Sequence, residues 1–342
     1  MATTFRMAVW AAAFAATALA AGDGEAVSKA AERVRATAAK APPAIGREFC
    51  SMAAKALAGR YPTLSKELTP GANAAVSGAG TAAPRPAAGS PEVDAIRKQI
   101  GQMRSLATDA ERARLAIEMA AKIRDLPPGP GKLMLARGLG NLVTEGDLGP
   151  EALAAVAGAL ADALPQTPGD AGAYLELASL VRYEGVPALA SDPSFDAADA
   201  VLALEQALIA ENDFKLTGMD GKVYSLSGLR GHIVLLNFWA TWCPPCRKEM
   251  PDLQGLYNSY SDQGLIVLAV SDEPRETVAG FLAKQNYGFP VLLDPDHSVH
   301  NAFYINGIPK TFVFGRDGRL AAQAIDMRTE HQFQEMLRKA GL

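Results

Sequence analysis

Two kinds of hydrophobic pattern divide this chain. From residue 26 to about 210, apolar residues recur every three or four positions, which is the spacing of amphipathic helices. From about residue 213 onward, short continuous runs rich in Val, Ile and Leu appear instead, at 232–237, 265–270 and 291–293. Runs of this kind predict buried strands. The chain is therefore expected to join an all-helical part to an α/β part.

The helical part contains a series of candidate helices separated by turns that are rich in Pro and Gly. They are expected at 26–40, from 44 to about 59, from 91 to 106, from 108 to 126, and at 132–143, 150–164, 169–183 and 195–210. Thr108 and Glu111 match the capping-box pattern at a helix start. The signature of tetratricopeptide repeats is missing, so we predict an irregular bundle or a short solenoid. It has no histidine and no obvious catalytic cluster, so we expect a docking or structural role.

The α/β part alternates strands with helices. Asp220-Gly221 lies between 213–216 and 222–225, which predicts a β-hairpin ahead of the buried strand at 232–237. A helix is expected at 277–286, a closing hairpin at 311–314 and 319–325, and a last helix at 329–340. Such alternation implies a largely parallel central sheet with helices packed on it.

The first residues indicate where the chain works. Arg6 precedes an uncharged apolar run that reaches about residue 22, and Ala18-Leu19-Ala20 offers a small-x-small cleavage site. This layout predicts a secretory signal peptide at 1–22, with an uncleaved N-terminal anchor as the alternative. Either reading implies a periplasmic or other extracytoplasmic location. We expect membrane contact only through such an anchor.

Length and composition limit the number of domains and the possible functions. The 342 residues suffice for two or three domains, and a formal net charge of −4 gives no support to nucleic-acid binding. We divide the chain into a helical segment at 23–68, a Pro/Gly/Ala-rich linker at 69–91, a helical domain at 92–210 and the α/β domain at 211–342. Of three cysteines, Cys50 flanks a helical apolar stripe, where a free thiol is most often a half-buried packing residue. A structural disulfide framework is excluded.

The other two cysteines stand where a buried strand passes into a helix. Cys243 would lie at the N-terminus of that helix, where free backbone N–H groups and the helix dipole favour a thiolate. Cys246, one turn later, is within reach to close a disulfide with it. Pro245 suits the first helical turn, in which no N–H partner is lost.

The run Trp242-Cys243-Pro244-Pro245-Cys246 at this corner resembles the active site of thioredoxin-fold proteins. More narrowly, it resembles the thiol-disulfide oxidoreductases of the TlpA/ResA type, within the redoxin or AhpC-TSA superfamily. The resemblance covers residues from about 213 to the end, well under half of the chain. It implies an α/β thioredoxin-like fold, with a central mixed sheet flanked by helices and an extra N-terminal hairpin.

The resemblance also implies roles for single residues. Cys243 would attack a partner's disulfide, and Cys246 would resolve the mixed disulfide. Pro309 matches the family's cis proline, which leaves the backbone of Ile308 open to a substrate strand; an ordinary trans proline is the alternative. Trp242, Pro244, Pro245 and Ile308 would contact the substrate. Trp242 would also shield the sulfurs, unless its role is only packing.

An acid is expected near the dithiol. Glu249 matches a glutamate of the ResA-like branch that handles protons, and the alternative is a solvated acid in the first helical turn. Asn237 occupies the position where thioredoxins have a buried acid. This departure removes one proton acceptor and strengthens the case for Glu249, because the exchange still needs a base.

Other chemistries fit less well. Haem attachment needs a histidine after the second cysteine, where Arg247 stands. No Cys or His pair completes a zinc site, and His297 and His300 are expected to be solvated rather than metal ligands. A thiol peroxidase remains an alternative within the superfamily, although its Pro-x-x-x-Thr-x-x-Cys segment is missing. We expect no metal and no cofactor besides the redox-active disulfide.

The function predicted is that of an extracytoplasmic protein-disulfide reductase. Its partners would be protein dithiol or disulfide clients, with apocytochrome c as one candidate, and a membrane thiol-electron transporter would supply electrons. The alternative is a binding module, in which the helical domain recruits a client or membrane partner and redox chemistry is secondary.

Overall fold

The computed structural model describes residues 24–69, 90–142, 147–164, 170–184, 186, 192–324 and 326–342. The predicted signal peptide or anchor at 1–22 and nearly all of the predicted linker lie outside these ranges. Within them, no helix has both the length and the apolar character needed to cross a membrane. The chain divides into two compact units, which are described separately.

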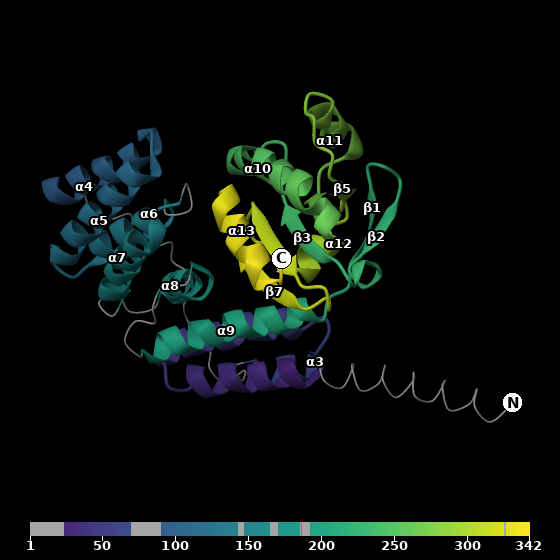
Figure 1. Ribbon diagram of the computed structural model, residues 1–342. Coiled ribbons are helices and arrows are strands. Elements are labelled where there is room, and N and C mark those ends of the chain that lie inside the picture. The colour runs from purple at the N-terminus through teal and green to yellow at the C-terminus, as the bar shows by residue number, and fades with distance from the viewer. Residues whose placement is uncertain are drawn as a thin grey trace, which may run out of the picture. The chain divides into compact units, whose positions relative to one another are not determined.

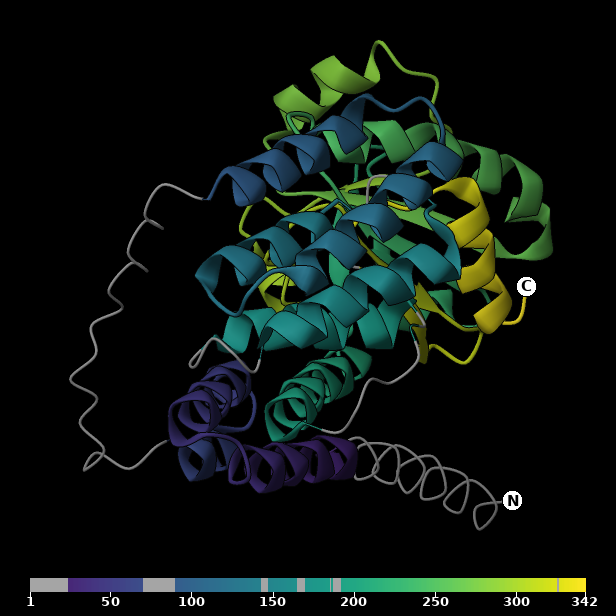
Figure 2. The same cartoon turned by 90° about the vertical axis from the view of Figure 1, so that its left-hand side faces the viewer.

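The first unit consists of helices. It contains helical backbone at 24–38, α2 (Pro43–Leu57), α3 (Pro62–Leu68) and α9 (Pro193–Ala210). α2 packs against α3 and α9, and its Phe49 and Leu57 are fully buried. Figure 2 shows α9 in green beside the purple helices. α9 belongs to this unit and not, as the sequence predicts, to the helical domain at 92–210. The sequence does not predict α3, because seven residues are too few for a periodic pattern. Cys50 is half-buried, as expected.

The second unit begins with a set of packed helices. They are α4 (Pro91–Gln102), the 3-10 turn η1 (Met103–Ser105), α5 (Asp109–Asp125), α6 (Pro130–Gly140), α7 (Gly149–Ala163) and α8 (Ala171–Glu184). The predicted capping box of α5 is confirmed, because Glu111 N donates to Thr108 Oγ1 and Thr108 N donates to Glu111 Oε2. α5 and α6 both pack against α7, and these blue-to-teal helices lie side by side in Figure 2.

The same unit contains a mixed β-sheet. Among the described residues, seven strands pair in the order β2-β1-β5-β4-β3-β6-β7. They are β1 (Lys215–Gly218), β2 (Val223–Ser225), β3 (Ile233–Phe238), β4 (Leu265–Ser271), β5 (Val291–Leu293), β6 (Lys310–Phe314) and β7 (Leu320–Ala324). Figure 1 shows β1 and β2 at one edge and β7, beside α13 (Glu330–Lys339), at the other. This is the predicted thioredoxin-like fold, with its extra β1–β2 hairpin.

β3 is an inner strand of the sheet, and its side chains contribute to the apolar packing on both faces of the sheet. It pairs in parallel with β4 and antiparallel with β6, and every residue in it is buried. Because side chains alternate along a strand, Ile233 and Leu235 face the core under α10 (Pro244–Tyr260) and α13. Phe238 faces an aromatic cluster with Phe303 and Phe312. The helices α11 (Arg275–Leu282) and α12 (Ser298–Ala302) complete this part. The strong burial of β3 makes its C-terminal end a rigid support for whatever follows.

Candidate active site

Cys243 and Cys246 form a disulfide at the end of that support, where β3 passes into α10. Cys243 is the N-cap of α10, and its Sγ accepts a hydrogen bond of 3.2 Å from the backbone N–H of Cys246. The Cα atoms of the pair are 5.3 Å apart. Pro244 and Pro245 occupy the first turn, where a missing N–H costs no helical hydrogen bond. The expected placement of the dithiol at a helix N-terminus is therefore confirmed.

The dithiol lies just below the protein surface. Cys243 is 2% exposed and Cys246 is completely buried, whereas Pro244 and Pro245 are exposed. Trp242 is 68% exposed, so it does not serve as a core packing residue. Exposed apolar side chains beside a reactive group are a suitable contact for another protein.

Thr241, just before this run, is held by an acid that sequence reasoning missed. Its backbone N–H and its Oγ1 donate to the two carboxylate oxygens of Glu273, at 2.6 and 2.7 Å. Glu273 follows β4, the parallel neighbour of β3, so both loops leave the sheet at the same edge. The only sequence signal for this contact is an acid shortly after a buried strand. The pair fixes the start of the active-site loop.

A second segment approaches the dithiol from β6. The Ile308–Pro309 peptide bond is cis, as predicted, and Pro309 is buried while Ile308 is partly exposed. The carbonyl oxygen of Ile308 lies 3.8 Å from Cys243 Sγ. The pairing of β6 with β3 brings these residues together although 65 positions separate them.

Glu249 lies beneath the surface on α10, one turn after Cys246. It is 1% exposed, so the solvated alternative is wrong. Asn237 Nδ2 donates to its Oε1 at 2.7 Å, and the backbone N–H of Arg328 donates to its Oε2 at 3.1 Å. Burial raises the pKa of Glu249 to about 8, while the hydrogen bonds from Asn237 and Arg328 and the charge of Arg328 work in the opposite direction. A carboxyl with such a pKa can give and take a proton at neutral pH.

Arg328 is the other residue that sequence reasoning missed. Its guanidinium is almost fully buried and forms an ion pair with Glu184, the last residue of α8. The two residues are 144 positions apart, and no motif or periodicity connects them. Glu249, Asn237 and Arg328 thus form one buried polar cluster next to the dithiol.

The two histidines behave differently from what was expected. His300 is buried, and its Nδ1 lies 2.6 Å from Asp294 Oδ2, so the expectation of a solvated side chain is wrong for this residue. His297 is more than half exposed. Burial favours a higher pKa for Asp294, but hydrogen bonds from His300, Val299 and Ser298 hold it well below its usual range. Within the described ranges, no group of three or more His, Cys, Asp or Glu residues is arranged to hold a metal ion.

Comparison with known proteins covers the α/β part. Residues 210–323 match the AhpC/TSA family. The thiol-disulfide oxidoreductase ResA of Bacillus thuringiensis (strain Al Hakam) is 34% identical over 128 residues, which are 37% of this chain and 74% of that protein. ResA of Geobacillus thermodenitrificans is 35% identical over 126 residues, 36% of this chain and 72% of that protein. A thiol:disulfide interchange protein of Chlorobium tepidum matches in structure with a TM-score of 0.34 and 30% identity, covering 37% of this chain and 92% of that one.

Proposed function

The chain belongs to the ResA family of thiol-disulfide oxidoreductases, and on this premise we propose that it reduces disulfide bonds of other proteins outside the cytoplasm. The observation that carries the proposal is the disulfide of Cys243 and Cys246 at a helix N-terminus, one turn from the buried carboxyl of Glu249. The helix terminus favours a thiolate on Cys243, and Glu249 is an acid that can exchange protons near pH 7.

The reaction starts from the reduced dithiol. The thiolate of Cys243 attacks one sulfur of the client's disulfide, so a Cys243–client bond forms and the other client sulfur leaves as a thiolate. Glu249 accepts the proton of the Cys246 thiol, and Cys246 then attacks Cys243 Sγ. The second client sulfur leaves as a thiolate and takes the proton held by Glu249, solvent protonates the first client thiolate, and the chain ends with the Cys243–Cys246 disulfide. A membrane thiol-electron transporter is the proposed donor that reduces it again.

The client would bind across the two exposed segments beside the dithiol. Trp242, Pro244 and Pro245 offer apolar contact on one side, and the backbone of Ile308, before Pro309, offers hydrogen bonds on the other. An extended peptide that carries a disulfide fits between them. The oxidised Cys-x-x-Cys-His segment of an apocytochrome c is the client class that we propose, which would place the chain in cytochrome c maturation.

The location is proposed from the first residues of the sequence. The apolar run up to about residue 22 would export the chain or anchor it, and a thiol reductase outside the cytoplasm then needs electrons delivered through the membrane.

A trapping experiment tests the proposed reaction. Cys246→Ser removes the resolving thiol, so the reduced variant should accumulate a mixed disulfide between Cys243 and a peptide with an oxidised Cys-x-x-Cys-His segment, seen by mass spectrometry. Cys50→Ser in the same background is the matched control and should trap equally well, whereas Cys243→Ser should trap nothing. If Cys243→Ser retained the biological function of the intact chain, a binding module with secondary redox chemistry would be the better description.

A further inference from the structure

Arg328 connects the buried acid of the site to the helices that precede the α/β part. Its backbone N–H donates to Glu249 Oε2 at 3.1 Å, and its guanidinium donates to Glu184 Oε1 and, at 3.0 Å, to the carbonyl oxygen of Met327. The Arg328 side chain is only 5% exposed. One residue therefore contacts Glu249 with its main chain and Glu184 with its side chain.

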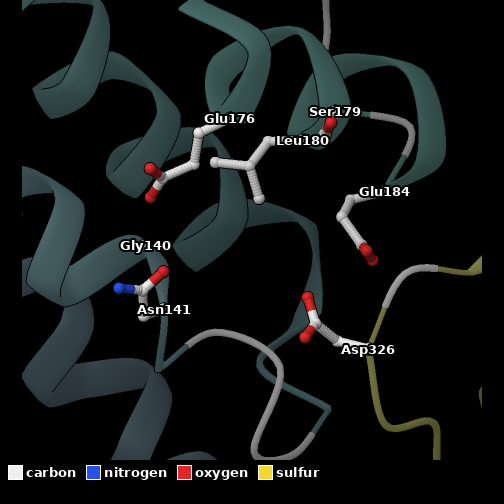
Figure 3. Close-up of a pocket in the computed structure, with 7 residues that line it drawn as sticks. All are labelled: Gly140, Asn141, Glu176, Ser179, Leu180, Glu184 and Asp326. Carbon is white, nitrogen blue, oxygen red and sulfur yellow. The ribbon is translucent and has the colours of Figure 1, made fainter. Parts of the chain in front are cut away.

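Glu184 supplies the opposite charge that this buried guanidinium needs. Its side chain is only 10% exposed. Glu184 is the last residue of α8, which packs against β7 within the same unit. Figure 3 shows Glu184 on the same cavity as Asp326, in the turn that leads from β7 to Arg328. Removing one partner of a buried ion pair leaves an uncompensated charge, which is strongly unfavourable. Glu184 thus determines where the Arg328 side chain lies, and with it the course of the turn.

We infer that Glu184 is a positioning residue for the thiol-disulfide site: its carboxylate holds Arg328, and Arg328 holds the N–H group that binds Glu249. The inference rests on the role proposed for Glu249 in the exchange reaction. It gives the helices at 91–184 a direct part in the chemistry, besides any docking or structural role.

The charges around Glu249 show how Glu184 can affect the ionisation of this carboxyl. Asp252 on α10 adds a negative charge, Arg328 adds a positive one, and Asn237 is neutral. The charge of Arg328 is itself balanced by Glu184, so little net positive charge remains to stabilise an anion at Glu249.

Two further acids, Glu176 and Asp326, line the cavity beside Glu184, and its volume of about 280 Å³ leaves room for several water molecules at roughly 30 Å³ each. Burial raises the pKa of Asp326 to about 6, with Arg328 opposing and Glu184 and Glu176 adding to the effect. The carboxyls of Glu176 and Asp326 therefore lie beside the Glu184–Arg328 ion pair and interact with its charges.

Removing the negative charge of Glu184 and removing the positive charge of Arg328 should shift the pKa of Glu249 in opposite directions. Glu184→Gln keeps the length and an acceptor oxygen but removes the carboxylate that pairs with Arg328, so the pKa of Glu249 should fall by about one unit. Arg328→Met removes the positive charge, so the pKa of Glu249 should rise by about one unit. The double variant has a neutral pair again and should return close to the unmodified chain. A mere loss of packing would instead shift the pKa of Glu249 in the same direction in all three variants.

The measurement is a pH titration of the side-chain carboxyl carbons by carbon-13 NMR, on the oxidised full chain, with Glu249→Gln to assign the signal. Asp147→Asn is the matched control, because it removes a carboxylate of the same helical part that contacts His331 on α13 and not Arg328. In Asp147→Asn, the titration curve of Glu249 should match that of the unmodified chain. An unchanged Glu249 titration in Glu184→Gln, or shifts of the same sign in both single variants, would overturn the inference. A chain that shows the expected shifts but exchanges no disulfide with clients would refute the proposed function alone.

Discussion

Replacing Glu249 by Gln should remove a fall in stability that the α/β part otherwise shows as the pH rises from 4.5 to about 8. The ordinary pKa of the carboxyl is 4.5, and in the folded chain burial raises it to about 8. Between these values the folded chain holds a proton that the unfolded chain has already released. Stability therefore falls as the pH rises from 4.5 to 8, and it is lowest above pH 8.

The magnitude follows from the same two values. At about 1.4 kcal/mol for each pKa unit, ionising Glu249 in the folded state costs up to about 5 kcal/mol above pH 8. Glu249→Gln removes this cost, but its amide group faces Asn237 or Arg328 with a donor where an acceptor is needed, a loss of about 1 kcal/mol. We expect the variant to be less stable by about 1 kcal/mol at pH 4 and more stable by about 4 kcal/mol at pH 8.5.

The assay is urea unfolding of the oxidised full chain at several pH values, followed by tryptophan fluorescence, to which Trp239, buried in the same core, contributes. Glu276→Gln is the matched control, because Glu276 is exposed on α11, and it should follow the unmodified chain at every pH. Stability curves for Glu249→Gln and the unmodified chain that run parallel from pH 4 to pH 8.5 would refute the reasoning.

Three further changes test other parts of the structure. Glu273→Ala should remove both hydrogen bonds to Thr241 and lower the unfolding free energy by about 2 kcal/mol; urea unfolding at an unchanged midpoint would contradict the contact. Asp294→Ala should cost about 3 kcal/mol at pH 7, because buried N–H groups and His300 lose their acceptor. The depressed pKa of Asp294 means that its contribution persists at neutral pH and is lost only in acid, so equal thermal stability of variant and parent at pH 7 would count against it. Thr108→Ala should cost about 1 kcal/mol and speed hydrogen exchange in the first turn of α5, with unchanged exchange as the contrary result.

Local patterns in the sequence predict most of the α/β part. The apolar run of β3 is buried on both faces, so it has no alternation, and its length and β-branched content identify it as a strand. Asp220-Gly221 predicts the β1–β2 hairpin because Gly221 adopts a positive φ of 78°. The dithiol follows from the corner between this strand and the next helix, since both features are encoded within about 15 residues.

The buried polar cluster could not be predicted in the same way. Glu249 stands in a polar stretch at a helix start, and only the resemblance to the ResA-like branch distinguishes it there from a surface acid. Those partners, Asn237 and the backbone of Arg328, are 12 and 79 positions away and meet it only when the sheet and α13 assemble. Glu184 is farther still from Arg328, and a single charge at the end of α8 carries no signal of burial. Long-range contacts between single polar residues therefore needed the structure.

The reduction potential of the Cys243–Cys246 pair tests the central claim most directly. A protein-disulfide reductase needs a pair whose disulfide is stable relative to its dithiol, so that electrons pass from the pair to the client. Equilibration of the full chain with dithiothreitol or glutathione buffers at pH 7 should give a value near or below that of thioredoxin, about −270 mV. A value near about −120 mV would identify an oxidant that introduces disulfides, and the proposal of a protein-disulfide reductase would be contradicted.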